Sequence, residues 1–130
     1  MGARIFLGLF GLVAISFGII CLLDPGFLDA FAGVAATSTT GTIELRAMYG
    51  GMQIALGVLA LLGAFRPAFT RTALLATGIL CAGLGSSRLL GAIAVSEVSS
   101  YTSGGLVFEL GSTAIAALSL RRLSQVASLH

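Results

Sequence analysis

The sequence has very little charge. Only 9% of its 130 residues are charged, whereas a soluble domain carries roughly 25% because its surface faces water. The chain is 57% hydrophobic, with a mean hydropathy of +1.06. So few charges exclude an ordinary soluble domain and indicate a protein in lipid. The length allows one domain, residues 1–130.

The residues that usually carry catalysis or metal binding are also scarce. The formal net charge is only +2 and no basic run exists, which excludes a nucleic-acid partner. The single His, His130, stands at the C-terminus, so no metal, haem or His-activated serine site is expected. A carboxylate enzyme built on Glu44 and Glu109 is the one catalytic alternative left. We predict no catalytic residue, no metal and no cofactor.

Long apolar runs are the dominant feature that is present. A helix needs about 20 apolar residues to cross a bilayer core about 30 Å thick, and four runs are long enough. We therefore predict an all-α fold, a polytopic bundle of four transmembrane helices. Arg66-Pro67 separates the second helix from the third as a tight hairpin. The predicted helices are residues 4–23, 44–65, 70–95 and 104–120, with an external loop at 24–43 and a polar turn at 99–104.

The long loop has its own pattern. Phe27, Leu28 and Phe31 share one helical face, which predicts a short helix at the membrane surface, with Asp24 as its cap and Pro25 in its first turn. Residues 36–42 are expected to form a polar loop. Disorder of the whole connection is the alternative.

The arginines predict the orientation of the bundle. All seven basic residues are Arg, and five of them flank the helices on one side; the positive-inside rule makes this side cytoplasmic, together with both termini. The five acids lie on or toward the other side. The flanking arginines are Arg4, Arg66, Arg71, Arg121 and Arg122, and the acids are Asp24, Asp29, Glu44, Glu97 and Glu109.

Reporter fusions test this orientation. Fusions at Thr39 and Ser100 should read as external, because both positions lie at the end of the bundle that lacks the five flanking arginines. A fusion at His130 should read as cytoplasmic. A cytoplasmic signal at Thr39 or Ser100 would show that the orientation is inverted.

Several polar residues lie inside the predicted spans. With a rise of about 1.5 Å per residue, Arg46 lies about 30 Å from the cytoplasmic interface, Arg88 about 25 Å, Gln53 about 20 Å and Glu109 about 18 Å. Three helices thus place polar groups in the outer half of the bilayer. By the same reasoning Cys21 and Cys81 differ in depth, about 25 against 15 Å, so we expect two free thiols.

These polar residues share helical faces with small residues. Small residues mark helix–helix interfaces in lipid because they let backbones approach closely, so the charges should point inward. The first helix has such a stripe without a charge and should close the bundle. In chain order the four stripes are Gly8, Gly11, Ile15 and Gly18; Arg46, Tyr49, Gly50, Gln53 and Gly57; Gly78, Cys81, Gly85, Arg88 and Ala92; and Gly105, Glu109, Ser112 and Ala116.

Charges inside a membrane should be paired, because each costs at least about 2.5–3.5 kcal/mol. We expect Arg88 to pair with Glu109, and Arg46 with Glu44 or Glu109. Three interpretations remain: an ion network that only fixes helix register, a functional polar pocket open to the outer side, or arginines that extend to the headgroups. Glu44 has the further alternative of a solvated first-turn acid.

The segment Glu44-Leu45-Arg46-Ala47-Met48-Tyr49-Gly50-Gly51-Met52-Gln53 resembles the signature of a bacterial family of small four-helix membrane proteins, domain-of-unknown-function family 4345. The family's later Arg and Gly resemble Arg88 and Gly91, and its acid in the fourth helix resembles Glu109. Its acidic-Gly turn is not matched, since Glu97 and serines stand there. The resemblance implies a four-helix fold in the bacterial cytoplasmic (inner) membrane, and no activity.

Two functions fit these observations. The first is binding or moving a small amphiphile or lipid, including an isoprenoid or quinone-like molecule, whose anionic head two arginines would hold. The second is a non-catalytic accessory subunit of a larger membrane complex. The expected partners are membrane lipids and a larger complex or a second copy of the chain. The candidate ligand-binding or ion-network residues are Glu44, Arg46, Tyr49, Gln53, Arg88 and Glu109.

Overall fold

The structure is a computed structural model that describes residues 1–96 and 98–127. Glu97 and His130, both used in the expected topology, lie outside these residues. The described chain is helical and contains four helices long and apolar enough to cross a membrane. The protein is thus an all-α, small multi-pass membrane protein, as the sequence predicted. Its elements are α1 (Gly2–Leu23), α2 (Phe27–Ala32), α3 (Thr39–Leu45), η1 (Arg46–Gly51), α4 (Met52–Phe65), α5 (Pro67–Val95) and α6 (Ser100–Ala127).

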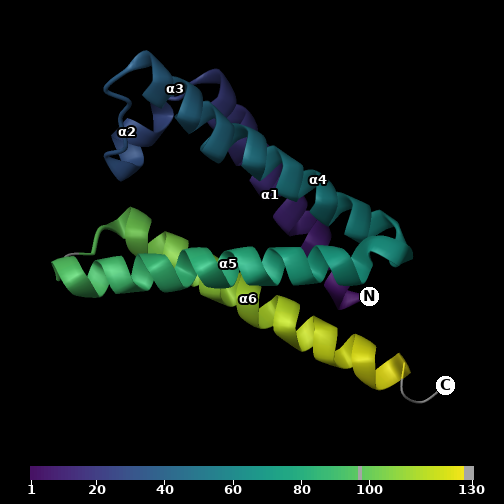
Figure 1. Ribbon diagram of the computed structural model, residues 1–130. Coiled ribbons are helices and arrows are strands. Elements are labelled where there is room, and N and C mark those ends of the chain that lie inside the picture. Colours follow the sequence, from purple (N-terminus) through teal and green to yellow (C-terminus); the bar gives the residue numbers. More distant parts are fainter. Residues whose placement is uncertain (97, 128–130) are drawn as a thin grey trace.

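The long helices form two antiparallel pairs (Figure 1). One pair is α1 with the continuous helix α3–η1–α4, and the other is α5 with α6. The pairs meet near the α4–α5 turn and diverge toward the end that carries α2 and α3 (Figure 1). Buried Leu7, Ala64 and Ala73 join α1, α4 and α5 near the α4–α5 turn.

Glycines bring α1 and the second long helix into backbone contact. A Cβ at Gly11 would lie 2.8 Å from the carbonyl oxygen of Gly57, and a Cβ at Gly57 would lie 2.8 Å from that of Gly11. A Cβ at Gly18 would likewise lie 2.8 Å from the carbonyl oxygen of Gly50. Small residues permit this approach in lipid. The glycine stripe of the first helix therefore packs as the sequence predicted.

The α4–α5 turn is fastened to the start of α1. Helix α4 ends at Phe65 and α5 begins at Pro67, which confirms the tight hairpin. The Arg4 guanidinium donates from Nε to the carbonyl oxygen of Ala64 at 2.5 Å and from Nη2 to that of Phe65 at 3.1 Å. These carbonyls lie at a helix C-terminus, where a cation is favourable. Arg4 is therefore a helix cap as well as a flanking charge.

The α4–α5 end gathers the flanking arginines. A hollow there is lined by Arg4, Arg71 and Ser124 among others, so the start of α1, the start of α5 and the end of α6 lie together. The arginines that flank the helices thus share one end of the bundle, and α2 and α3 lie at the other (Figure 1). The side of the membrane that each end faces stays a prediction.

The connection after α1 is more ordered than a loop. The expected short helix exists as α2, and Phe27 and Phe31 lie 4.8 Å apart between ring centroids. Its cap is Gly26 rather than Asp24. The Asp24 carboxylate instead accepts a hydrogen bond from the Gly26 N–H at 3.0 Å, because an Asp side chain bonds readily to the backbone two residues on.

The four long helices begin earlier than predicted, and the difference is largest for the second and the fourth. The second long helix begins at Thr39 rather than at Glu44, because Ser38 Oγ accepts the Gly41 N–H at 3.0 Å and caps it. The fourth begins at Ser100 rather than at Gly104, and Ser99 Oγ accepts the Thr102 N–H at 3.1 Å. In both places, serines and threonines that were predicted to form a loop instead belong to the cap and the first turn of a helix.

Both cysteines are free and buried, as predicted. Without prior reduction, a thiol reagent should label Cys21 and Cys81 after denaturation and neither before it, because each is at most 3% exposed. Mass spectrometry of the intact protein measures the labels, and the single variants Cys21→Ser and Cys81→Ser serve as controls. A product that takes up label only after reduction would contradict the assignment of two free thiols.

Candidate functional site

The second long helix contains a π-helical turn at the residues that carry the family resemblance. Helix η1 covers Arg46–Gly51. Such turns are rare within α-helices and occur frequently at functional sites. The expected single stripe is divided here: Gly50 and Gly57 are buried against α1, whereas Tyr49 and Gln53 line a cavity. This turn was not predictable from the sequence, because its residues also suit an α-helix.

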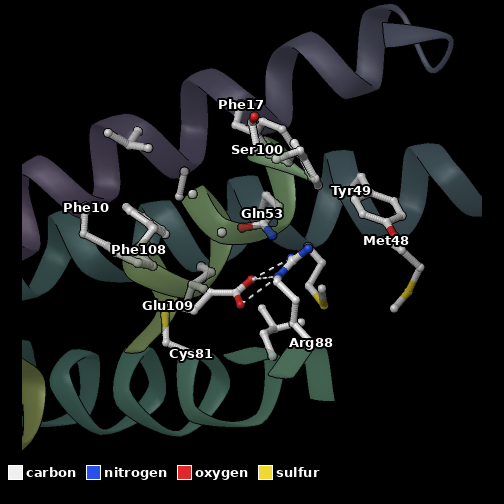
Figure 2. A pocket seen from close by; sticks show the side chains of 18 residues that line it. Phe10, Phe17, Met48, Tyr49, Gln53, Cys81, Arg88, Ser100, Phe108 and Glu109 are labelled. Atoms are coloured by element: carbon white, nitrogen blue, oxygen red, sulfur yellow. Dashed lines mark hydrogen bonds and ion pairs between the residues drawn. The ribbon is translucent and has the colours of Figure 1, made fainter. Parts of the chain in front are cut away.

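A cavity of about 640 Å³ lies between the two helix pairs. The rings of Phe10 and Phe108 stack with centroids 5.6 Å apart and join α1 to α6 beside it. The polar side chains of Arg88, Gln53 and Tyr49 lie on the side away from these two rings (Figure 2). A volume of this size is usual for a small-molecule site. The lining residues are Phe10, Val13, Ala14, Phe17, Met48, Tyr49, Met52, Gln53, Leu56, Cys81, Leu84, Arg88, Ser100, Tyr101, Gly104, Gly105, Phe108 and Glu109.

The Arg88–Glu109 ion pair lies in the cavity wall (Figure 2). Arg88 Nη2 donates to Glu109 Oε1 at 2.8 Å, and Nε donates to Oε2 at 3.0 Å and to Oε1 at 3.2 Å. The Glu109 side chain is only 8% exposed, against 28% for Arg88. The predicted pair is confirmed. Since Arg88 turns inward to an acid, it does not extend to the headgroups.

Helix α6 shapes the place where the Arg88 side chain lies. The Arg88 Cζ lies 5.6 Å from the centroid of the Tyr101 ring, a distance at which a guanidinium is attracted to a ring face. A Cβ at Gly105 would lie 2.9 Å from Arg88 Nε and 3.0 Å from Cζ. Glycine at 105 therefore lets the guanidinium lie against the backbone of α6.

Tyr101 was missed as a site residue. Its signal was the spacing of Tyr101, Gly105 and Glu109, which repeats every four residues and places all three on one helical face. The signal was hidden because residues 99–104 were predicted to form a turn. Once α6 begins at Ser100, Tyr101 belongs to the same face as Glu109.

Two predicted site residues lie elsewhere. Arg46 was expected to pair with Glu44 or Glu109, but its Nε donates to the carbonyl oxygen of Leu22 at 3.2 Å. Over residues 1–96 and 98–127 the only ion pair is Arg88–Glu109. Neither Arg46 nor Glu44 lines the cavity, and both are exposed. Arg46 is the first residue of the π-helical turn η1. Its partner is a carbonyl group at the C-terminus of α1, where the last carbonyls have no partner within their own helix.

Tyr49 and Gln53 do line the cavity (Figure 2). Both are half-buried. In the described part of the chain neither side chain forms a hydrogen bond to the protein. The Gln53 amide offers two N–H donors and a carbonyl acceptor, and the Tyr49 hydroxyl offers one donor and an acceptor. These groups are therefore placed to bond to a molecule in the cavity.

The two acids of the catalytic alternative, Glu44 and Glu109, do not lie in one site. Glu109 accepts hydrogen bonds from Arg88, and Glu44 lies outside the cavity lining. The two carboxylates of the catalytic alternative are thus not brought together. Among the residues that the structure describes, no group of three His, Cys, Asp or Glu side chains is placed to hold a metal ion.

The resemblance noted in the sequence is supported by comparison with protein families. A family model described as domain of unknown function (DUF4345) matches residues 2–120. The match includes η1, the cavity lining and the Arg88–Glu109 pair. No curated protein and no solved structure matches the chain. Because the matched region covers all four long helices except the last residues of α6, this small multi-pass membrane protein belongs to the DUF4345 family.

Proposed function

We propose that the protein binds a small amphiphile in the cavity between its helix pairs. The observation that carries the proposal is the arrangement of the cavity wall. Phe10, Leu56 and Phe108 make one part apolar, and Arg88 and Gln53 make another part polar. Small-molecule sites commonly combine an apolar lining with a few placed polar groups. Such a wall is complementary to a molecule that has a polar head and an apolar body.

The proposal extends to the place of the cavity in the membrane. Helices α2 and α3 lie at the end of the bundle opposite the α4–α5 turn (Figure 1). The polar lining residues Tyr49 and Gln53 follow α3 directly, at the start of the second long helix. By the positive-inside rule this end faces away from the cytoplasm. The protein would then take its ligand from the outer leaflet of a bacterial cytoplasmic membrane. The reporter fusions at Thr39 and Ser100 test this part.

Native mass spectrometry after purification in a mild detergent tests the binding. The expected result is a mass increment on the wild-type protein that corresponds to one bound amphiphile. The variant Gly104→Leu should lose this increment. Gly104 lines the cavity, and a Cβ at this position would meet nothing within 4 Å. The leucine side chain therefore fills cavity space without a backbone clash.

The matched control is Gly83→Leu. Gly83 is exposed on α5 outside the cavity lining, and its Cβ would also meet nothing within 4 Å. This variant should keep the increment. Equal increments in wild type, Gly104→Leu and Gly83→Leu would place the bound molecule outside the cavity, and a wild type without any increment would contradict the proposal.

One observation favours the alternative, a non-catalytic accessory subunit of a larger complex. Gly83, Ser87 and Gly91 are spaced by four residues on one exposed face of α5. Small residues at this spacing are typical of contacts between membrane helices. The same native spectra test this alternative, because a stoichiometric protein partner or a second copy would appear as a larger complex. Gly83→Leu should then dissociate it, whereas Gly104→Leu should not.

A further inference from the structure

The charges of the cavity wall cancel. Among the described residues that line the cavity, Arg88 and Glu109 are the only Arg, Lys, Asp or Glu, and they are joined by hydrogen bonds of 2.8–3.2 Å. The sequence suggested two arginines for an anionic head, but Arg46 lies outside the lining and donates to Leu22. The cavity thus holds a compensated pair instead of a free cation.

A charged head would enter this cavity without a counter-charge. An anion beside Arg88 would also lie beside the Glu109 carboxylate, and a cation beside Glu109 would lie beside the guanidinium, since these atoms are within 3.2 Å of each other. A charge taken from water into an apolar site without its own partner is strongly unfavourable. The ion pair therefore disfavours heads of either sign.

An uncharged polar head would find suitable partners. The Arg88 Nη1 group donates to no protein atom among the described residues, and the Gln53 amide has no protein partner there either. A guanidinium that is already paired with a carboxylate keeps N–H donors for a further acceptor. Tyr49 and Tyr101, which also carry hydroxyl groups, line the same space. These groups match a head with carbonyl, amide or hydroxyl oxygens.

We infer that the ligand is an uncharged amphiphile whose head accepts hydrogen bonds from Arg88 and Gln53. This inference rests on the proposed function and specifies its ligand class. The apolar body lies against the aromatic side chains of Phe10, Phe17 and Phe108. Glu109 acts here as a selectivity residue, because it cancels the charge of the arginine that contacts the head.

Three probes with the same alkyl chain test the inference by competition. Hexadecanamide is uncharged, whereas hexadecanoate is anionic and hexadecylamine is cationic at about pH 9. The wild-type protein, with equal amounts of all three in native mass spectrometry, should bind the amide in preference to each ion by about tenfold or more, because each ion loses solvation in the cavity. Gly104→Leu should abolish this preference, and Gly83→Leu should keep it.

Two variants test the role assigned to Glu109. Glu109→Gln leaves Arg88 without its carboxylate, so the preference should shift by about tenfold or more toward hexadecanoate. The double variant Arg88→Met with Glu109→Leu removes the donor and both charges, so its binding of the amide should fall and hexadecanoate should gain nothing. If Glu109→Gln fails to fold, the wild-type competition and the double variant still decide the matter.

The outcomes separate the two claims. A wild-type preference for hexadecanoate or hexadecylamine, lost in Gly104→Leu, would overturn the uncharged head while binding in the cavity stands. Binding of all three probes to the same extent would also overturn it. Probe binding that is unaffected by Gly104→Leu would remove the cavity as the site, and with it both claims.

Discussion

Glu109→Gln is expected to destabilise the protein by roughly 3 kcal/mol, because removing one partner of a buried ion pair leaves the other charge uncompensated. Glu109 is buried with a side-chain exposure of 8%, and three hydrogen bonds join it to Arg88. The double variant Arg88→Met with Glu109→Leu should recover most of the loss. The measurement is the free energy of unfolding in detergent or bilayers, from reversible unfolding with a denaturing detergent.

The control for this prediction is Glu44→Gln. Glu44 is an exposed acid that lies outside the cavity lining, so the same chemical change should alter the free energy of unfolding little. Equal losses in Glu44→Gln and Glu109→Gln would contradict the assigned role of the pair. So would a double variant Arg88→Met with Glu109→Leu that is at least as unstable as Glu109→Gln, since removing both charges would then bring no compensation.

Gly57→Ala should destabilise the protein by about 2 kcal/mol, because the added methyl group overpacks a backbone contact. A Cβ at Gly57 would lie 2.8 Å from the carbonyl oxygen of Gly11, 3.0 Å from the backbone nitrogen of Ile15 and 2.6 Å from its Cγ1 atom. Backbone atoms of a packed helix cannot move aside as the end of a flexible side chain does. Helices α1 and α4 would therefore have to separate. Reversible unfolding again gives the magnitude.

The matched control is Gly83→Ala, the same substitution on α5. A Cβ at Gly83 would meet nothing within 4 Å, and alanine is the better helix former. This variant should be neutral or slightly stabilised. A loss at Gly57 no larger than at Gly83 would show that the α1–α4 contact is not close enough to require glycine.

The helices and their number follow from the sequence, because each long apolar run must satisfy its backbone hydrogen bonds within lipid, and a helix does this locally. The hairpin at Arg66-Pro67 was predictable for the same local reason. The first residues of the helices were less predictable. Ser38 and Ser99 are residues that suit both a polar loop and an N-cap, and the structure uses them as caps.

The candidate site was predictable in part. Arg88 and Glu109 were predicted to pair because both lie in the outer half of the bilayer, both share a helical face with small residues, and an unpaired charge in lipid is costly. These local features were sufficient to predict the ion pair. Arg46 met the same criteria and yet lies outside the cavity. Its place is decided by the π-helical turn and by the open carbonyl of Leu22 at the end of α1. Neither feature can be recognised from the composition of the sequence or from the helical period of its apolar residues.

The sequence by itself determined that the protein lies in lipid, that it has four long apolar helices and that Arg88 pairs with Glu109. These features depend on hydropathy and on the cost of charge in lipid. Only the tertiary structure decided where the cavity lies and which groups line it. The glycine contacts hold α1 and α4 together along their length, whereas the two pairs meet mainly near the α4–α5 turn. Helices fixed at one end diverge toward the other, and that divergence places Gln53, Tyr49 and Tyr101 around the ion pair.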